Sequence, residues 1–177
     1  MKIAVYCASK DGNNENYAHA AEELGAYIGA HHHQLVYGAS DVGLMGVLAR
    51  SVHRHGGSIY GVGLEMFSNR IGNYGEIDEL YVAKTFPERR TKMLELGDAF
   101  IALPGGIGTL DEISEALCLS TFYFPQKPII FWNTDGYYDS IKAFIERASK
   151  DGFLYRDADK RVRFLASIEE LDLVLKT

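Results

Sequence analysis

The stretch AFIALPGGIGTLDEISEALCL, residues 99–119, runs from an apolar strand through a glycine-rich loop directly into a helix. Glycines allow a backbone to approach a ligand closely, and a helix N-terminus presents free N–H groups with partial positive charge. The loop Gly105-Gly106-Ile107-Gly108-Thr109 therefore predicts a phosphate site. Its spacing fits neither the dinucleotide fingerprint nor the P-loop. A tight strand-to-helix turn without a ligand explains the same glycines equally well.

Three carboxylates follow this loop within two helical turns, on Asp111, Glu112 and Glu115. Thr109 and Glu112 match the capping box, in which the acid accepts a hydrogen bond from the backbone N–H of the threonine. Helix-dipole complementarity also favours the first two acids. A phosphate in the loop would occupy the same N–H groups and leave Glu112 to face the ligand. Both interpretations stay open on the sequence alone, although periodicity by itself favours capping.

The alternation of short apolar runs with helical periods extends along the whole chain. Strand patterns occur at 2–7, 34–38, 58–63, 99–103 and 128–132, with weaker ones at 79–83 and 163–166. Helical patterns occur at 14–29, 43–57, 87–97, from 109, after 136 and from about 167, and residues 63–78 are predicted to be irregular. Strands separated by helices imply right-handed crossovers in a parallel sheet. We predict an α/β fold, a single-domain Rossmann-like doubly wound parallel sheet over 1–177 with helices on both faces.

Composition narrows the functional classes. The chain has 177 residues, 47% of them hydrophobic, and a formal net charge of −6, which argues against a nucleic-acid partner. Cys7 and Cys118 lie far apart, so neither a disulfide framework nor a zinc site is expected. The histidines at 31–33 end a predicted helix, where cations suit the dipole, so we expect no metal. A signal peptide and membrane-spanning segments are not expected, so we predict a cytoplasmic protein.

Basic residues that could bind an anion gather in FPERRTK, which contains Arg89, Arg90 and Lys92. Arginine binds phosphate and carboxylate through two parallel hydrogen bonds, although a solvated helix face explains a charge run as well. Neighbouring helical residues point about 100° apart, so we expect at most one arginine to face the ligand edge.

Two further segments have both a functional and a purely structural interpretation. YGASDVGLMG places Gly38, Gly43 and Gly46 between a strand and a helix, as a second ligand loop or as close helix packing. LCLSTFYF, residues 117–124, is apolar on nearly all sides, which is typical of a core helix or a subunit interface. We predict a homodimer. Cys7, at the end of the first strand, is predicted to be buried packing.

Several blocks together resemble one known family. LPGGIGTLDE matches the PGGxGTxxE motif of the LOG family, the cytokinin riboside 5′-monophosphate phosphoribohydrolases. The blocks KIAVYCAS, VYGASDVGLMGVLA, PERR, GDAFIALPGG and WNTDGYYD are similar to further family segments in the same order. The family is also labelled lysine decarboxylase, but these blocks contain no lysine motif for pyridoxal phosphate.

The resemblance implies hydrolysis of the N-glycosidic bond of a nucleoside 5′-monophosphate, with adenine or an N6-modified adenine as the base and no metal or other cofactor. It places Arg89 and Glu112 at the catalytic positions. We assign substrate binding to the loop 105–109 and to four other residues: Ser9, Gly38, Arg90 and Glu115. The expected partner is a small-molecule nucleotide, with no nucleic acid and no membrane.

The chain departs from the family at one predicted loop. Ala39-Ser40-Asp41 stands where the family has a glycine run, and an acid at position 41 would repel a nearby phosphate. The alternative function is therefore a non-catalytic nucleotide or cofactor carrier on the same fold. An NAD(P)-dependent oxidoreductase is disfavoured, because CASKDG after the first strand is not a dinucleotide fingerprint.

Overall fold

The computed structural model describes residues 1–71, 76–155 and 158–176. Seven strands form one parallel sheet in the order β4-β3-β2-β1-β5-β6-β7. Their bounds are β1 (Lys2–Tyr6), β2 (Gln34–Tyr37), β3 (Ser58–Leu64), β4 (Glu79–Ala83), β5 (Ala99–Ala102), β6 (Ile129–Trp132) and β7 (Val162–Leu165). Both weaker strand patterns are confirmed as the edge strands β4 and β7.

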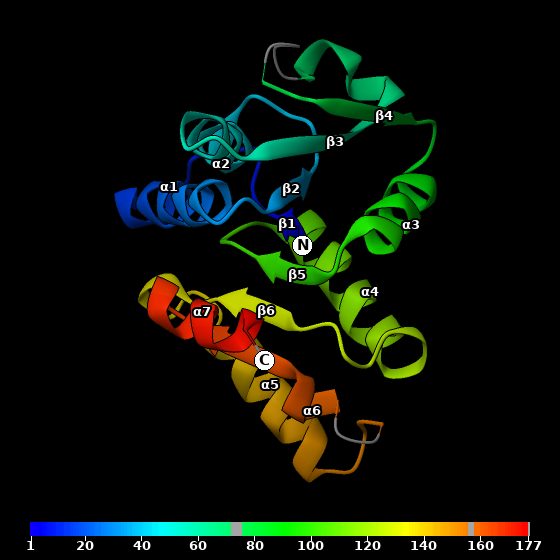
Figure 1. The fold of residues 1–177 in the computed structure, drawn as a ribbon. Helices are drawn as coiled ribbons and strands as arrows, with labels where there is room; N and C mark the ends of the chain where they lie inside the picture. Colours follow the sequence, from blue (N-terminus) through cyan, green and yellow to red (C-terminus); the bar gives the residue numbers. More distant parts are fainter. Residues whose placement is uncertain (72–75, 156–157, 177) are drawn as a thin grey trace.

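Helices cover both faces of the sheet, which confirms the predicted Rossmann-like α/β fold (Figure 1). One core layer joins the sheet to α1 (Glu15–Ala30), α2 (Gly43–Arg54) and α7 (Ile168–Leu175). The opposite layer joins it to α3 (Phe86–Leu96), α4 (Ile107–Tyr123) and α5 (Asp139–Lys150). Strand alternation explains the two layers: Ile3 and Val5 enter the first, whereas Ala4 and Tyr6 enter the second.

The strand order reverses at β1, which lies between β2 and β5. At such a switch point the connections that leave the carboxyl ends of two neighbouring strands run to opposite faces and leave a crevice between them. Here the loop after β1 and the loop after β5 meet, and Ala8 donates a backbone hydrogen bond to the Pro104 carbonyl at 3.2 Å. The fold thus brings the glycine loop beside CASKDG.

Two predicted elements differ from the structure. The helix expected to start at Thr109 begins at Ile107, with Gly106 as its N-cap. The segment 63–78, expected to be irregular, contains a 3-10 helix, η1 (Glu65–Arg70), while its residues 72–75 lie outside the described residues. A second short 3-10 turn is η2 (Thr134–Gly136), and α6 spans Ala158–Arg161. Among the described residues, no helix is long and apolar enough to span a membrane.

Candidate active site

A cavity of about 630 Å³ opens at the carboxyl ends of the central strands. Its size lies in the range of small-molecule sites. The loops after β1, β2, β3 and β5 all contribute to its wall. Its lining includes Cys7, Ser9, Gly38, Met45, Phe67, Arg70, Arg89, Arg90, Gly105, Gly106, Gly108, Thr109, Asp111, Glu112 and Tyr137. Most predicted substrate-binding residues therefore share one cavity.

The glycine loop ends in an uncapped helix. Gly106 is the N-cap of α4 without a side-chain cap, and no described residue accepts from the backbone N–H groups of 106–109. A Cβ added at Gly106 or Gly108 would meet no atom within 4 Å, so protein packing does not require these glycines. Gly105 differs, because a Cβ there would lie 2.1 Å from the Thr109 hydroxyl oxygen. Free N–H groups, open space and a helix N-terminus together form an anion-binding geometry.

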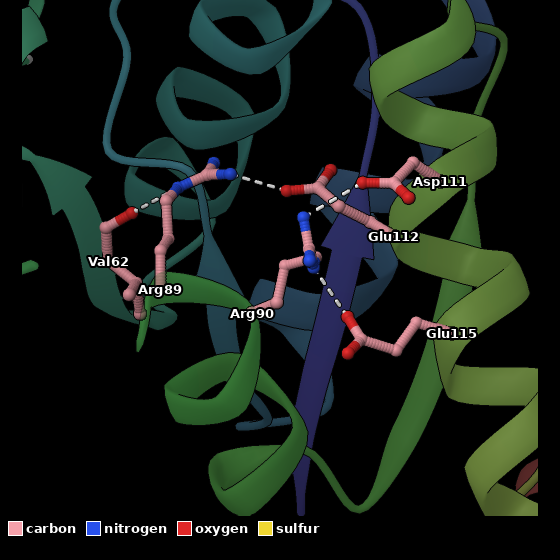
Figure 2. Close-up of polar contacts among 6 residues, drawn as sticks. All are labelled: Val62, Arg89, Arg90, Asp111, Glu112 and Glu115. Carbon is pink, nitrogen blue, oxygen red and sulfur yellow. Dashed lines mark hydrogen bonds and ion pairs between the residues drawn. The ribbon is translucent and has the colours of Figure 1, made fainter. Parts of the chain in front are cut away.

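Glu112 does not cap the helix, so the capping interpretation is wrong. Because α4 begins at Ile107, Thr109 is already the third residue of the helix. The Glu112 carboxylate instead accepts a hydrogen bond from Nη1 of Arg89 (Figure 2). The Nε group of Arg89 donates to the Val62 carbonyl on β3 at 2.9 Å. Sheet and helix therefore fix the arginine between them.

The Arg89–Glu112 pair is largely shielded from solvent, with each side chain only 13% exposed. Burial raises the pKa of Glu112 above its ordinary value of 4.5, and the Arg89 guanidinium opposes that rise. Removing one partner would leave a buried charge without compensation, which is strongly unfavourable. The site therefore places a carboxylate, whose charged form burial disfavours, beside the glycine loop.

Gly38 makes room for this arrangement. A Cβ at Gly38 would lie 2.2 Å from Nη2 of Arg89 and 2.9 Å from Sδ of Met45. No other residue type fits without displacing the guanidinium. Gly38 lines the cavity as expected, and the structure gives it a packing role toward Arg89.

Arg90 also reaches α4, so the expectation that at most one arginine faces the ligand edge is wrong. Its guanidinium binds Asp111 at 3.0 Å through Nη1 and Glu115 at 2.6 Å through Nε (Figure 2). A long side chain compensates for the 100° offset along the helix. Two expected substrate-binding residues lie elsewhere: Glu115 pairs with Arg90 outside the cavity lining, and Ile107 is 82% exposed and also outside it.

The second glycine loop mainly serves packing. Gly43 has φ +60°, and a Cβ added there would lie 2.3 Å from the Lys10 backbone nitrogen. A Cβ added at Gly46 would lie 2.0 Å from the Asp41 carbonyl oxygen. Ala39 adopts φ 59°, a left-handed conformation that a family glycine would adopt without strain. Asp41 is exposed and not part of the cavity lining, so the expected repulsion of a phosphate does not arise there.

Sequence reasoning missed several cavity residues. Tyr137, which directly follows η2, lines the cavity and donates a hydrogen bond from its hydroxyl to the Gly105 carbonyl at 2.6 Å. In the sequence, only its place in the family-like block WNTDGYYD pointed to this residue. Arg70 and Phe67 come from η1, where Arg70 lies over the Phe67 ring at 5.6 Å.

The two cysteines lie in different surroundings. Cys7 is buried as predicted, and desolvation raises the pKa of its thiol, so it stays neutral beside the cavity. Cys118 is exposed. No group of three or more His, Cys, Asp or Glu side chains among the described residues is arranged to hold a metal ion.

Comparison with known proteins decides the family. Residues 45–173 match the model of a family described as "Possible lysine decarboxylase". A cytokinin riboside 5′-monophosphate phosphoribohydrolase of Oryza sativa subsp. japonica is 35% identical over 175 residues, which cover 99% of this chain and 72% of that protein. The chain belongs to the LOG family. An LOG relative from Rhodococcoides fascians with the same name is 37% identical over 169 residues, 94% of this chain and 85% of that protein.

Solved structures share the fold. The molybdenum cofactor carrier protein of Chlamydomonas reinhardtii aligns with a TM-score of 0.74 and 21% identity, covering 99% of this chain and 98% of that one. The molybdenum cofactor binding protein of Rippkaea orientalis aligns equally well, also with a TM-score of 0.74. At this identity the likeness shows the fold alone.

Proposed function

We propose that this LOG-family protein hydrolyses the N-glycosidic bond of a purine nucleoside 5′-monophosphate, releasing the free base and ribose 5-phosphate. The buried Arg89–Glu112 pair beside the free N–H groups of 106–109, in one cavity, is the observation that carries the proposal. The names of relatives at 35% and 37% identity over nearly the whole chain support the same activity. Adenine and N6-modified adenines are the proposed bases, with AMP as the simplest substrate.

The geometry suits a reaction that builds positive charge on a sugar. As the bond from C1′ to the base nitrogen breaks, its electron pair leaves with the base and the ribose becomes oxocarbenium-like. The Glu112 carboxylate stabilises that charge and orients or deprotonates the attacking water. Water adds to C1′, and the departing base takes up a proton.

The phosphate loop explains why a carboxylate lies next to an anion site. The N–H groups of 106–109 bind the 5′-phosphate, which does not react, and its binding energy places C1′ against Glu112. Phosphate and carboxylate contact opposite ends of one small sugar, so they do not oppose each other. Arg89 holds Glu112 in place, and its positive charge lowers the pKa of Glu112 and so opposes the rise that burial causes.

A homodimer is part of the proposal. Phe122 and Tyr123, in the last turn of α4, are 59% and 76% exposed, and Phe122 packs edge-on against the Tyr155 ring. Large exposed aromatic groups are typical of interfaces. Light scattering is expected to give twice the mass of one chain. Nucleic-acid and membrane partners are not part of the proposal, and a cytoplasmic location stays a prediction.

The carrier function is the second candidate, because carrier and binding proteins of the molybdenum cofactor share this fold. A carrier would use the anion-binding loop without turnover. Binding without turnover does not require a largely buried carboxylate at position 112.

Product analysis separates the two functions. We would incubate AMP and isopentenyladenosine 5′-monophosphate with the wild type, Glu112→Gln and Glu88→Gln, and quantify free base by chromatography. Glu88 binds the Tyr81 hydroxyl and the Lys84 N–H outside the cavity lining, so it is a matched control for carboxylate loss. The proposal predicts base from the wild type and Glu88→Gln only. Nucleotide binding without base from any of them would support the carrier.

A further inference from the structure

Two consecutive tyrosines bind the connection between β5 and α4. The Tyr138 hydroxyl donates to the Leu103 carbonyl at 2.7 Å, and the Tyr137 hydroxyl donates to the Gly105 carbonyl at 2.6 Å. Their surroundings differ sharply. Tyr138 is 3% exposed and belongs to the core, whereas Tyr137 is 41% exposed and lines the cavity.

The segment that carries Tyr137 is fastened to the N-terminus of α1. Asp135 accepts hydrogen bonds from the side-chain amides of Asn14 and Asn16, each at 2.8 Å. The Tyr17 ring packs edge-on against the Tyr137 ring, with centroids 5.3 Å apart. Tyr137 is thus held from behind and directs its hydroxyl at the glycine loop.

The Gly105 carbonyl belongs to the same peptide unit as the Gly106 N–H. In a trans peptide the two groups point in opposite directions within one plane, and no described peptide bond is cis. Fixing the carbonyl therefore fixes the direction of the N–H. Gly106 itself cannot fix it, because its Cβ position is empty of contacts and glycine has wide conformational freedom.

We propose that Tyr137 is a positioning residue for the phosphate site: its hydroxyl orients the Gly105–Gly106 peptide so that the free N–H groups at the start of α4 converge on the 5′-phosphate. This inference rests on the proposed function. Tyr138 fixes the Leu103 carbonyl, two residues before Gly105, for stability, whereas Tyr137 serves ligand binding. The two hydroxyls are therefore expected to affect different measurements.

The test compares Tyr137→Phe with Tyr138→Phe, each of which removes one hydroxyl. Calorimetry would measure the affinity for ribose 5-phosphate, which carries the phosphate, and for adenosine, which lacks it. Thermal melting would be recorded on the same samples. We expect Tyr137→Phe to weaken ribose 5-phosphate binding about three- to tenfold, the usual effect of one hydrogen bond, with adenosine binding and melting temperature nearly unchanged. Tyr138→Phe is expected to lower the melting temperature and leave ribose 5-phosphate affinity unchanged.

Other results would overturn the inference. Equal weakening for ribose 5-phosphate and adenosine, or no weakening in Tyr137→Phe, would show that its hydroxyl does not act on the phosphate. If only the proposed function fails, the wild type binds ribose 5-phosphate but releases no base from AMP. The effect of Tyr137→Phe on ribose 5-phosphate binding can still be measured in that case. A wild type that binds no ribose 5-phosphate would overturn both.

Discussion

Replacing Gly108 with alanine is expected to make the protein more stable and less able to bind its substrate. Gly108 is the second residue of α4, is not among the described residues with positive φ, and has no atom within 4 Å of its Cβ position. Alanine is favoured over glycine in a helix by about 0.5–1 kcal/mol. For a chain of this size, that gain corresponds to a melting temperature about 1–4 °C higher.

The loss of binding follows from the same empty space. Gly108 lines the cavity, so the new methyl group lies where the bound phosphate approaches the backbone. We expect ribose 5-phosphate affinity to fall at least about tenfold, equivalent to about 1.4 kcal/mol. Differential scanning fluorimetry and titration calorimetry measure the two effects independently.

A control on the same helix is Ser114→Ala, because Ser114 is exposed and outside the cavity lining. It is expected to gain a few tenths of a kcal/mol from helix propensity with unchanged affinity, since Ser lies only slightly below Ala in that scale. A Gly108→Ala variant that binds ribose 5-phosphate as tightly as the wild type would refute a phosphate site at the start of α4. A lower melting temperature would refute the open space around Gly108.

Three further predictions concern the Arg89–Glu112 pair and the helix that carries Arg89. Gly38→Ala places a Cβ 2.2 Å from Arg89 Nη2, so kcat should fall about 100-fold or more in steady-state assays, and unchanged kcat would contradict the packing role. Burial raises the pKa of Glu112, and the proposed reaction needs its ionised carboxylate, so kcat/KM should fall as the pH drops through a value above 4.5. A fall in kcat/KM that begins only below pH 4.5 would contradict this. Thr85→Ala removes the cap that accepts from the Glu88 N–H, so the free energy of unfolding should fall by about 1 kcal/mol in urea titrations with activity kept, and unchanged stability would exclude a capping contribution.

The sheet and its ligand edge could be predicted from the sequence because they depend on local patterns. Apolar runs between helical periods require parallel strands, and the loops after those strands must meet at one edge. The start of α4 could not be predicted in this way. Thr109 and Glu112 match a capping box, yet Glu112 pairs with Arg89, 23 residues away along the chain.

The same Thr-x-x-Glu pattern forms a real cap elsewhere. Thr85 accepts from the Glu88 N–H at 3.3 Å, and the Glu88 carboxylate accepts from the Lys84 N–H at 2.9 Å. The spacing of Thr and Glu is the same in the two places, but the Glu112 carboxylate pairs with a distant arginine instead of a backbone N–H. Tyr137 escaped prediction for the same reason, because its partner Gly105 is 32 residues away.

The proposed reaction in this cavity is the addition of water to C1′ of a nucleoside 5′-monophosphate. The most direct measurement is mass spectrometry of the products from AMP in ¹⁸O-labelled water, with the wild type and Glu112→Gln side by side. We expect equal amounts of adenine and ribose 5-phosphate from the wild type, with one ¹⁸O per sugar at C1, and neither product from the variant. Intact AMP in the wild-type reaction, or equal product from Glu112→Gln, would contradict it.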